Sequence, residues 1–418
     1  MNNDTSPTPP SKISSPPKGL ETLKWFGPGL LWMVSAAGSG ELLFSPRIGS
    51  LYGYTLLWAL LATVLLKWFI NREIGRYTVC TGKSILDGFK TLGGRSQWSL
   101  YLILVPQLFV AVATIAGLAG SSATALILAF PGDIQLWAVG AILTSTALVV
   151  WGKFKGVELV ASLLALLLAL ASIVAAILVF SDYEAFVQGF VPRIAPEVSY
   201  GEILPWLGFM LSGAAGMIWY SYWIQEKGYG RAGLSPDERQ KDPSYSEEDK
   251  KNLKGWLWHM TMDNNIAVIG TLIITIAFLI LGVEILKPAG LIPEESNVAR
   301  VLGQLLGKLW GPVGYWFMVI GVFIGFWSTV LSDQDGFGRM FAGGFRHLLK
   351  PVGIAEKWKQ PQFLNRFFVI GVVTILPIGL YLVMGEPVSL LKLAGFIEAA
   401  HIPILTALVL LLNHRELP

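Results

Sequence analysis

Four acidic residues lie inside or at the end of long apolar runs of this sequence, where a charged side chain is costly and usually functional. They are Glu41, Asp333, Asp335 and Glu398. A carboxylate in such a place can bind a cation. Glu398 also lies three residues before His401, so the two side chains share one helical face, and histidine titrates near neutral pH. We predict cation binding or proton coupling at these positions; the alternative is a set of buried polar pairs that only tie helices together.

The apolar runs that must hold these side chains indicate a membrane protein. The chain has 418 residues, of which 53% are hydrophobic and 14% are charged, whereas soluble proteins carry about 25% charged residues. A helix needs about 20 mostly apolar residues to cross the hydrocarbon layer. Ten candidate spans lie near residues 27–51, 54–71, 97–130, 134–151, 157–181, 201–224, 256–284, 310–335, 364–383 and 388–413. The sequence therefore predicts an all-α polytopic membrane protein with ten transmembrane helices.

The composition also excludes several classes of function. The net charge of +3 is too small to indicate nucleic-acid binding, and a single cysteine, Cys80, leaves no disulfide framework or cysteine metal cluster. Glycine-rich stretches such as residues 336–344 lack the strand–turn–helix setting of a phosphate loop. We predict no enzyme activity and no cofactor. The predicted partners are the lipid bilayer and a small solute, and the sequence gives no oligomeric state.

Lysine and arginine are distributed unevenly between alternate connections. Of the 31 Lys and Arg residues, 24 lie in segments on the same side as the N-terminus and six lie in the others. Lys67 lies inside the second span, near its inner end, where it can snorkel to the interface. The positive-inside rule then predicts a cytoplasmic N-terminus, in a bacterial inner membrane. Residues 1–23 are predicted to be a disordered tail, and residues 24–418 a single transmembrane domain with a solvated cytoplasmic insertion at 226–255.

Two spans contain small residues that favour local unwinding. Gly38-Ser39-Gly40 precedes Glu41 in the first span, and Ser212–Gly216 lies in the sixth. Glycine weakens a helix by about 1 kcal/mol, and unwound backbone at membrane depth must face protein or water. Matching interruptions in two halves predict an inverted-repeat transporter, with repeats at 24–181 and 201–413; the alternative is close packing of small residues. The predicted substrate-binding residues are Gly38, Ser39, Gly40, Glu41, Gly213, Ala214 and Tyr220, and the predicted coupling or pathway residues are Asp333, Asp335, Glu398 and His401.

Several motifs resemble those of the natural resistance-associated macrophage protein (Nramp) family of proton-coupled divalent-metal transporters. The matching segments are Gly27-Pro28-Gly29, Tyr52–Trp58, Arg76–Ser84, Tyr220–Lys227 and Asp263–Ala267. Each motif is weak alone, but their order and spacing extend over most of residues 25–415. The resemblance implies the amino acid-polyamine-organocation (LeuT-like) fold, in which helices 1 and 6 are broken and two five-helix repeats are inverted.

The sequence departs from this family where the family binds its metal. The family's DPGN motif in the first helix falls on residues 38–41, so its aspartate is replaced by Gly38 and its asparagine by Glu41. The methionine and histidine of the sixth helix fall on Gly213 and Ala215. The acids of the third helix, which are candidate proton acceptors, fall on Ile115 and Leu118. Ile115 and Leu118 cannot accept a proton, so the proton acceptors that the resemblance implies are missing at those positions.

The altered residues favour oxygen ligands over soft ones. Carboxylate, carbonyl and water oxygens suit Mg²⁺ and Mn²⁺, whereas thioether and imidazole suit softer metals. We predict secondary transport, as a symporter if it is proton-coupled, of a divalent cation such as partly hydrated Mg²⁺ or Mn²⁺, with Glu41 as a metal ligand. One alternative is an organic amine or amino acid stacked on aromatic residues such as Tyr220. The other is a non-transporting sensor.

Overall fold

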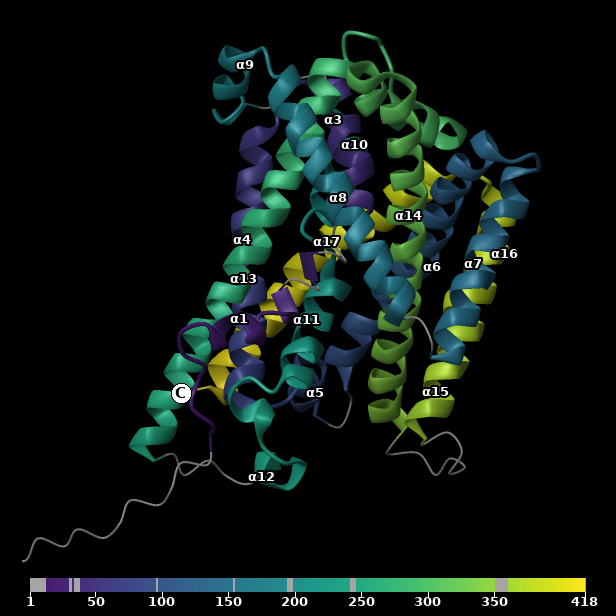
Figure 1. The fold of residues 1–418 in the computed structure, drawn as a ribbon. Helices are drawn as coiled ribbons and strands as arrows, with labels where there is room; N and C mark the ends of the chain where they lie inside the picture. The colour runs from purple at the N-terminus through teal and green to yellow at the C-terminus, as the bar shows by residue number, and fades with distance from the viewer. Residues whose placement is uncertain are drawn as a thin grey trace, which may run out of the picture.

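The structure is a computed structural model that describes residues 13–29, 32–33, 38–94, 97–152, 155–193, 198–240, 246–349 and 360–417. Within these ranges the chain forms helices and their connections, without a strand. In chain order the elements are α1 (Glu21–Trp25), η1 (Ser39–Phe44), α3 (Ser45–Tyr52), α4 (Leu57–Thr81), α5 (Ile85–Leu92), α6 (Trp98–Ala129), α7 (Ile134–Trp151), α8 (Lys155–Val179), α9 (Tyr183–Gln188), α10 (Tyr200–Phe209), α11 (Ala214–Lys227), η2 (Gly230–Gly233), α12 (Pro236–Gln240), α13 (Glu247–Leu281), η3 (Gly282–Leu286), η4 (Glu295–Asn297), α14 (Val298–Leu349), α15 (Pro361–Phe367), η6 (Phe368–Ile375), α16 (Leu376–Met384) and α17 (Pro387–Glu416). Figure 1 places α5, α12, α15 and the C-terminus at one end of the bundle, and α3 and α9 at the other.

Eight helical segments of the described chain are long and apolar enough to cross a membrane. They are Trp98–Ala129, Ile134–Trp151, Leu159–Val179, Tyr200–Lys227, Glu247–Leu286, Glu295–Leu348, Pro361–Met384 and Pro387–Glu416. They coincide with predicted spans three to ten. The first predicted span is interrupted, and the second, α4, carries three charged residues (Lys67, Arg72 and Glu73) in its first 18 positions. These features explain why the two remaining spans lack a continuous apolar signal.

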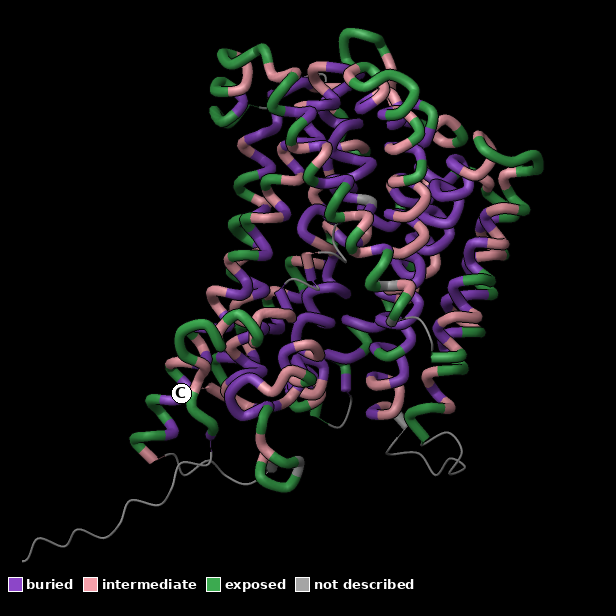
Figure 2. Tube along the Cα trace, viewed as in Figure 1, coloured by how far each residue is buried: buried purple, intermediate pink, exposed green. Residues whose placement is uncertain are grey.

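The outer faces of the bundle expose apolar side chains in long stripes. Along α8 the exposed large side chains are Leu159, Val160, Leu163, Leu166, Leu167, Leu170, Val174, Ile177 and Leu178. Figure 2 shows exposed positions on the outward sides of the peripheral helices, while the central helices are mostly buried. Soluble proteins rarely expose contiguous apolar patches of this size. The stripes are therefore the lipid-facing surface.

The N-terminal segment is tied to the rest of the protein from Ile13 onward. Ile13 is 3% exposed, its N–H donates to Asp249 over 3.0 Å and its carbonyl accepts from Asn252 over 2.9 Å. Trp256 Nε1 donates to the Ser14 carbonyl over 2.8 Å. The predicted disordered tail, residues 1–23, is therefore wrong from residue 13 on, because these side chains of α13 satisfy its backbone. Residues 1–12 lie outside the described part of the chain.

The predicted insertion at residues 226–255 is also more structured than expected. Its last nine residues, 247–255, already belong to α13, which begins with a capping box between Ser246 and Asp249. Tyr229 is fully buried and its hydroxyl donates to the Trp25 carbonyl, while its ring stacks on Trp256 at a centroid distance of 5.3 Å. Residues 229–232 of the segment are thus buried, whereas Ser235, Asp237, Glu238, Glu247 and Glu248 are exposed, as expected for a solvated connection.

The eighth span continues beyond the residues predicted to end it. α14 is kinked at Trp310 and Gly311, where the predicted span begins, and then runs to Leu349. Asp333 and Asp335 therefore lie within a helix and not at its C-terminus, which corrects the prediction. Gly336 lies inside this helix and packs closely against α11: a Cβ built there would lie 2.7 Å from the Trp219 ring.

Asp263 of α13 anchors the beginning of the first helix. Its carboxylate accepts the backbone N–H groups of Gly27, over 3.2 Å, and Gly29, over 2.6 Å. We expect Asp263→Ala to destabilise the protein by about 1–3 kcal/mol, because one buried and one partly buried donor lose their acceptor. Thermal unfolding of the purified protein measures this, with Asp237→Ala on the exposed face of α12 as the control. Equal melting temperatures for the two variants would contradict the anchoring role.

Candidate functional site

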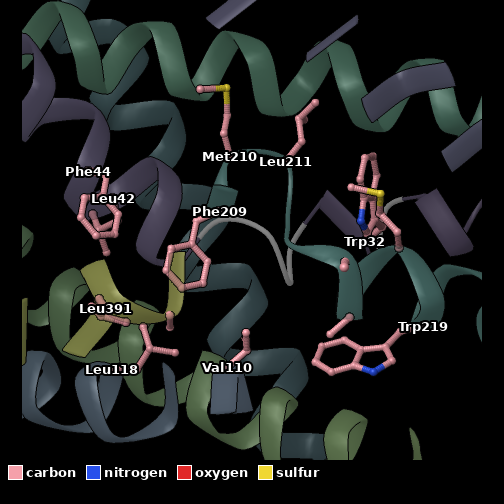
Figure 3. Packing of buried hydrophobic residues seen from close by; sticks show 14 of the residues in the cluster. Trp32, Leu42, Phe44, Val110, Leu118, Phe209, Met210, Leu211, Trp219 and Leu391 are labelled. Atoms are coloured by element: carbon pink, nitrogen blue, oxygen red, sulfur yellow. The ribbon is translucent and has the colours of Figure 1, made fainter. Parts of the chain in front are cut away.

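The sixth span is broken between α10 and α11, as predicted. Leu211 and Ser212 adopt left-handed backbone conformations, with φ of 55° and 73°, which cost roughly 1–2 kcal/mol each for residues with a side chain. The chain returns to a helix at Ala214. Figure 3 shows this turn with Phe209, Met210 and Leu211 among the large apolar side chains that pack around it. A strained conformation of this kind persists only where neighbouring groups hold it.

The break in the first span lies directly against this turn. Gly38 precedes the π-helical turn η1, and a Cβ on it would lie 2.8 Å from Thr329 Oγ1 of α14. A Cβ on Gly40 would lie 3.1–3.2 Å from the backbone of Phe209 and Met210. Gly38 therefore allows close contact with α14, and Gly40 allows the first break to approach the sixth. Ser39 begins η1, and its side chain lies outside the described part of the structure.

Glu41 braces the turn of the sixth span. The residue is fully buried, and Oε1 accepts the Leu211 N–H over 3.1 Å. Oε2 has no hydrogen-bond partner among the described atoms. Glu41 thus holds one of the two strained residues and keeps one oxygen free, so its prediction as a metal ligand stays a prediction.

Glu398 of α17 caps the N-terminus of α11. Its Oε2 accepts the Ala214 N–H over 2.9 Å, at the helix end where the macrodipole favours negative charge. A Cβ at Gly213 would lie 2.3 Å from Glu398 Oε1, so this position leaves no room for a side chain. The predicted residues Gly213, Ala214 and Glu398 are therefore brought together in one place.

Lys67 is the main residue that sequence reasoning missed. It is 1% exposed, and Nζ donates to the carbonyls of Gly208, Met210 and Ser212 over 2.8, 2.5 and 2.9 Å. The expectation that Lys67 snorkels to the interface is wrong, because its charge is satisfied at the C-terminus of α10. The sequence feature that could have indicated a buried charge is the position of this lysine, eleven residues into α4. The residues next to Lys67 in the sequence do not indicate which groups it contacts.

Glu398 and His401 do not bond to each other; Gln107 of α6 lies between them. Gln107 Nε2 is 3.2 Å from Glu398 Oε2 and 2.8 Å from His401 Nδ1, and His401 Nε2 is 3.1 Å from the Leu102 carbonyl. An amide nitrogen only donates and a carbonyl only accepts, so Nδ1 accepts and Nε2 carries the proton. This network assigns a neutral His401. It supports a structural role for His401 in this conformation, while the predicted coupling role of the pair stays a prediction.

A cavity of about 40 Å³ lies beside the break, between α6, α11, α14 and α17. Its oxygen-bearing lining residues are Thr114, Ser212, Thr329, Asp333 and Glu398. Thr114 is 5% exposed and its hydroxyl has no hydrogen-bond partner among the described residues. A water needs roughly 10–15 Å³ measured in this way, so the cavity can hold an ion with one or two waters. Asp333 and Glu398 are the two carboxylates that line it.

The other predicted residues lie outside this cavity. Asp335 pairs with Arg339, which also bonds Glu226 over 3.1 Å, and its predicted pathway role stays a prediction. Tyr220 is fully buried, with its ring 6.2 Å from that of Trp32. Glu41 is not among the residues that line the cavity. Within the described part of the chain, no three His, Cys, Asp or Glu side chains converge on one metal position.

Comparisons with known proteins agree with this architecture. A family model described as natural resistance-associated macrophage protein-like matches residues 29–418. An uncharacterized protein of Pasteurella multocida is 23% identical over 401 residues, which cover 93% of this chain and 86% of that protein. A divalent metal cation transporter, MntH of Chromohalobacter salexigens, is 33% identical over 75 residues, 18% of this chain and 17% of that protein.

Solved structures show the same fold. Crystal structures of two mutants of a manganese transporter from Eremococcus coleocola superpose with a TM-score of 0.68 at 17% identity. They cover 96% and 97% of this chain and 81% and 83% of those chains. The predicted fold class, an all-α polytopic membrane protein, is confirmed, and eight of the ten predicted spans form long apolar helices in the described chain.

Proposed function

This chain belongs to the natural resistance-associated macrophage protein-like family, and from that premise we propose that it is a secondary transporter of a divalent metal cation with oxygen ligands. The observation that carries the proposal is the cavity beside the two breaks, where Asp333 and Glu398 face one small space together with the unpartnered hydroxyl of Thr114. Two carboxylates and neutral oxygens are the ligands of hard cations. The cation is the substrate and not a resident cofactor.

The size and chemistry of the cavity favour a partly hydrated Mg²⁺ or Mn²⁺. Mg²⁺ keeps several waters and is usually bound by one or two carboxylates, which matches the two carboxylates present. The described lining contains no Met, Cys or His side chain, the ligands that select softer metals. Sites for organic molecules are roughly 300–1,000 Å³, far above the cavity volume of about 40 Å³. The ion is therefore a better candidate than an amino acid or amine.

The membrane placement follows from the charge distribution. We infer a cytoplasmic N-terminus and a bacterial inner membrane, because 24 of the 31 Lys and Arg residues belong to segments on one side. α5, α12 and α15, which carry several of these residues, lie at the same end of the bundle as the C-terminus (Figure 1).

Uptake into proteoliposomes tests the proposal. We expect Mg²⁺ and Mn²⁺ to enter faster than Cd²⁺, a softer ion, and amino acids and amines not to enter. The same assay with and without a pH gradient measures proton coupling. A preference for Cd²⁺ would contradict the hard-ion site, amine uptake without ion flux would favour an organic solute, and the absence of all flux would favour a sensor.

A further inference from the structure

The ammonium of Lys67 is held in the centre of the fold by backbone oxygens alone. A lysine ammonium has three N–H donors and no acceptor. All three are used, by the carbonyls of Gly208, Met210 and Ser212. Glu41 and Glu398 both act electrostatically on this ammonium without accepting a hydrogen bond from it. The partners of the charge are therefore three carbonyl dipoles.

These three carbonyls converge because the sixth span is broken. The last carbonyls of a helix have no partner within the helix, and they carry the negative end of the macrodipole. After α10 ends at Phe209, the left-handed conformations of Leu211 and Ser212 bring two further carbonyls to the same point. Unwound carbonyls and half-helix C-terminal ends are the groups that coordinate Na⁺ in inverted-repeat transporters.

We propose that the carbonyls of Gly208, Met210 and Ser212 form a monovalent-cation site, which the Lys67 ammonium of the chain itself occupies. An ammonium takes the place of a metal ion here because it carries one charge and satisfies the oxygens with directed N–H groups. The protein thus carries its own cation at the break, and these carbonyls are not available to the transported ion. The inference does not rest on the proposed transport function, since binding of an ion to this site can be measured without a transport assay.

Removal of the Lys67 ammonium should leave the three carbonyls free to bind a cation from solution. We expect Lys67→Ala to melt at a lower temperature than the wild type in choline chloride. We expect Na⁺ or methylammonium, at equal ionic strength, to raise its melting temperature saturably by about 2 °C or more. Equilibrium binding of labelled Na⁺ to Lys67→Ala should show one site that methylammonium competes for. The wild type should show neither the shift nor the binding.

Lys67→Met is the matched control, because methionine is also a long unbranched side chain but has no charge and no N–H donor. We expect it to be destabilised in every salt and to bind no Na⁺. The inference is overturned if Lys67→Ala melts at the same temperature in all three salts, or if Lys67→Met responds to Na⁺ as Lys67→Ala does. A saturable sodium dependence of the wild type would also overturn it, and that measurement does not require either variant to fold.

Discussion

Glu398→Gln and Asp333→Asn are each expected to lower divalent-cation uptake at least tenfold. Both substitutions keep the shape of the side chain and remove one negative charge from the cavity. A pair of unit charges 4 Å apart interacts by about 4 kcal/mol at an effective dielectric of 20, and desolvation offsets part of this. A tenfold loss corresponds to about 1.4 kcal/mol, so it is a conservative expectation.

Folding should be preserved in both variants. The amide oxygen of Gln at position 398 can still accept the N–H of Ala214, which Glu398 now accepts over 2.9 Å. Initial rates of Mn²⁺ and Mg²⁺ uptake in proteoliposomes measure the effect. Glu247→Gln serves as the control, because that carboxylate lies on the exposed first turn of α13, paired only with Lys250 in the described structure. Uptake above half of the wild-type rate in both site variants would contradict the proposal that the transported ion binds in this cavity.

The same assay decides the role of Glu41. A carboxylate that only braces Leu211 can be replaced by glutamine, whose amide oxygen also accepts an N–H. Full-rate uptake by Glu41→Gln would exclude the predicted role as a metal ligand. If Glu41→Gln lowers the uptake rate as much as Glu398→Gln does, the result would support contact between Glu41 Oε2 and the ion during transport.

Gly208→Ala is expected to have the largest effect on stability. α10 and α17 are in backbone contact at this position: a Cβ on Gly208 would lie 2.1 Å from the Gly395 carbonyl oxygen and 3.0 Å from the Ala399 nitrogen. A Cβ on Gly395 would in turn lie 2.7 Å from Pro205. Overpacking costs typically 1–3 kcal/mol, and here the obstructing atoms are backbone, so a whole helix must move. We expect a cost at or above the upper end of that range.

The displaced helix is the one that carries Glu398. We therefore expect Gly208→Ala to lose uptake together with stability, measured by the melting temperature and by the flux of the same preparation. Gly140→Ala in α7 is the matched control, because a Cβ there meets nothing within 4 Å. Alanine is also favoured over glycine in a helix by about 1 kcal/mol, so this control should be neutral or slightly more stable. Equal stability of the two variants would show that α10 and α17 can separate freely.

The sequence alone determined the membrane class, the approximate spans and the positions of the two breaks. These properties depend on local composition: runs of apolar residues, the distribution of Lys and Arg, and glycines such as Gly38, Gly40 and Gly213. It also indicated Glu41 and Glu398 correctly as buried acids. A carboxylate within an apolar run must be buried or face a cavity, whatever the tertiary structure.

Only the tertiary structure decided what the buried charges contact. Lys67 bonds carbonyls 141–145 residues away, and Glu398 bonds an N–H 184 residues away. Asp333 lines a cavity together with residues of α6, α11 and α17 that are distant from it in the sequence. Periodicity gives the face of one helix, but it does not give the height at which two distant helices cross. That relative height, set here by glycine contacts such as Gly208 on Gly395, brings each charge to its partner.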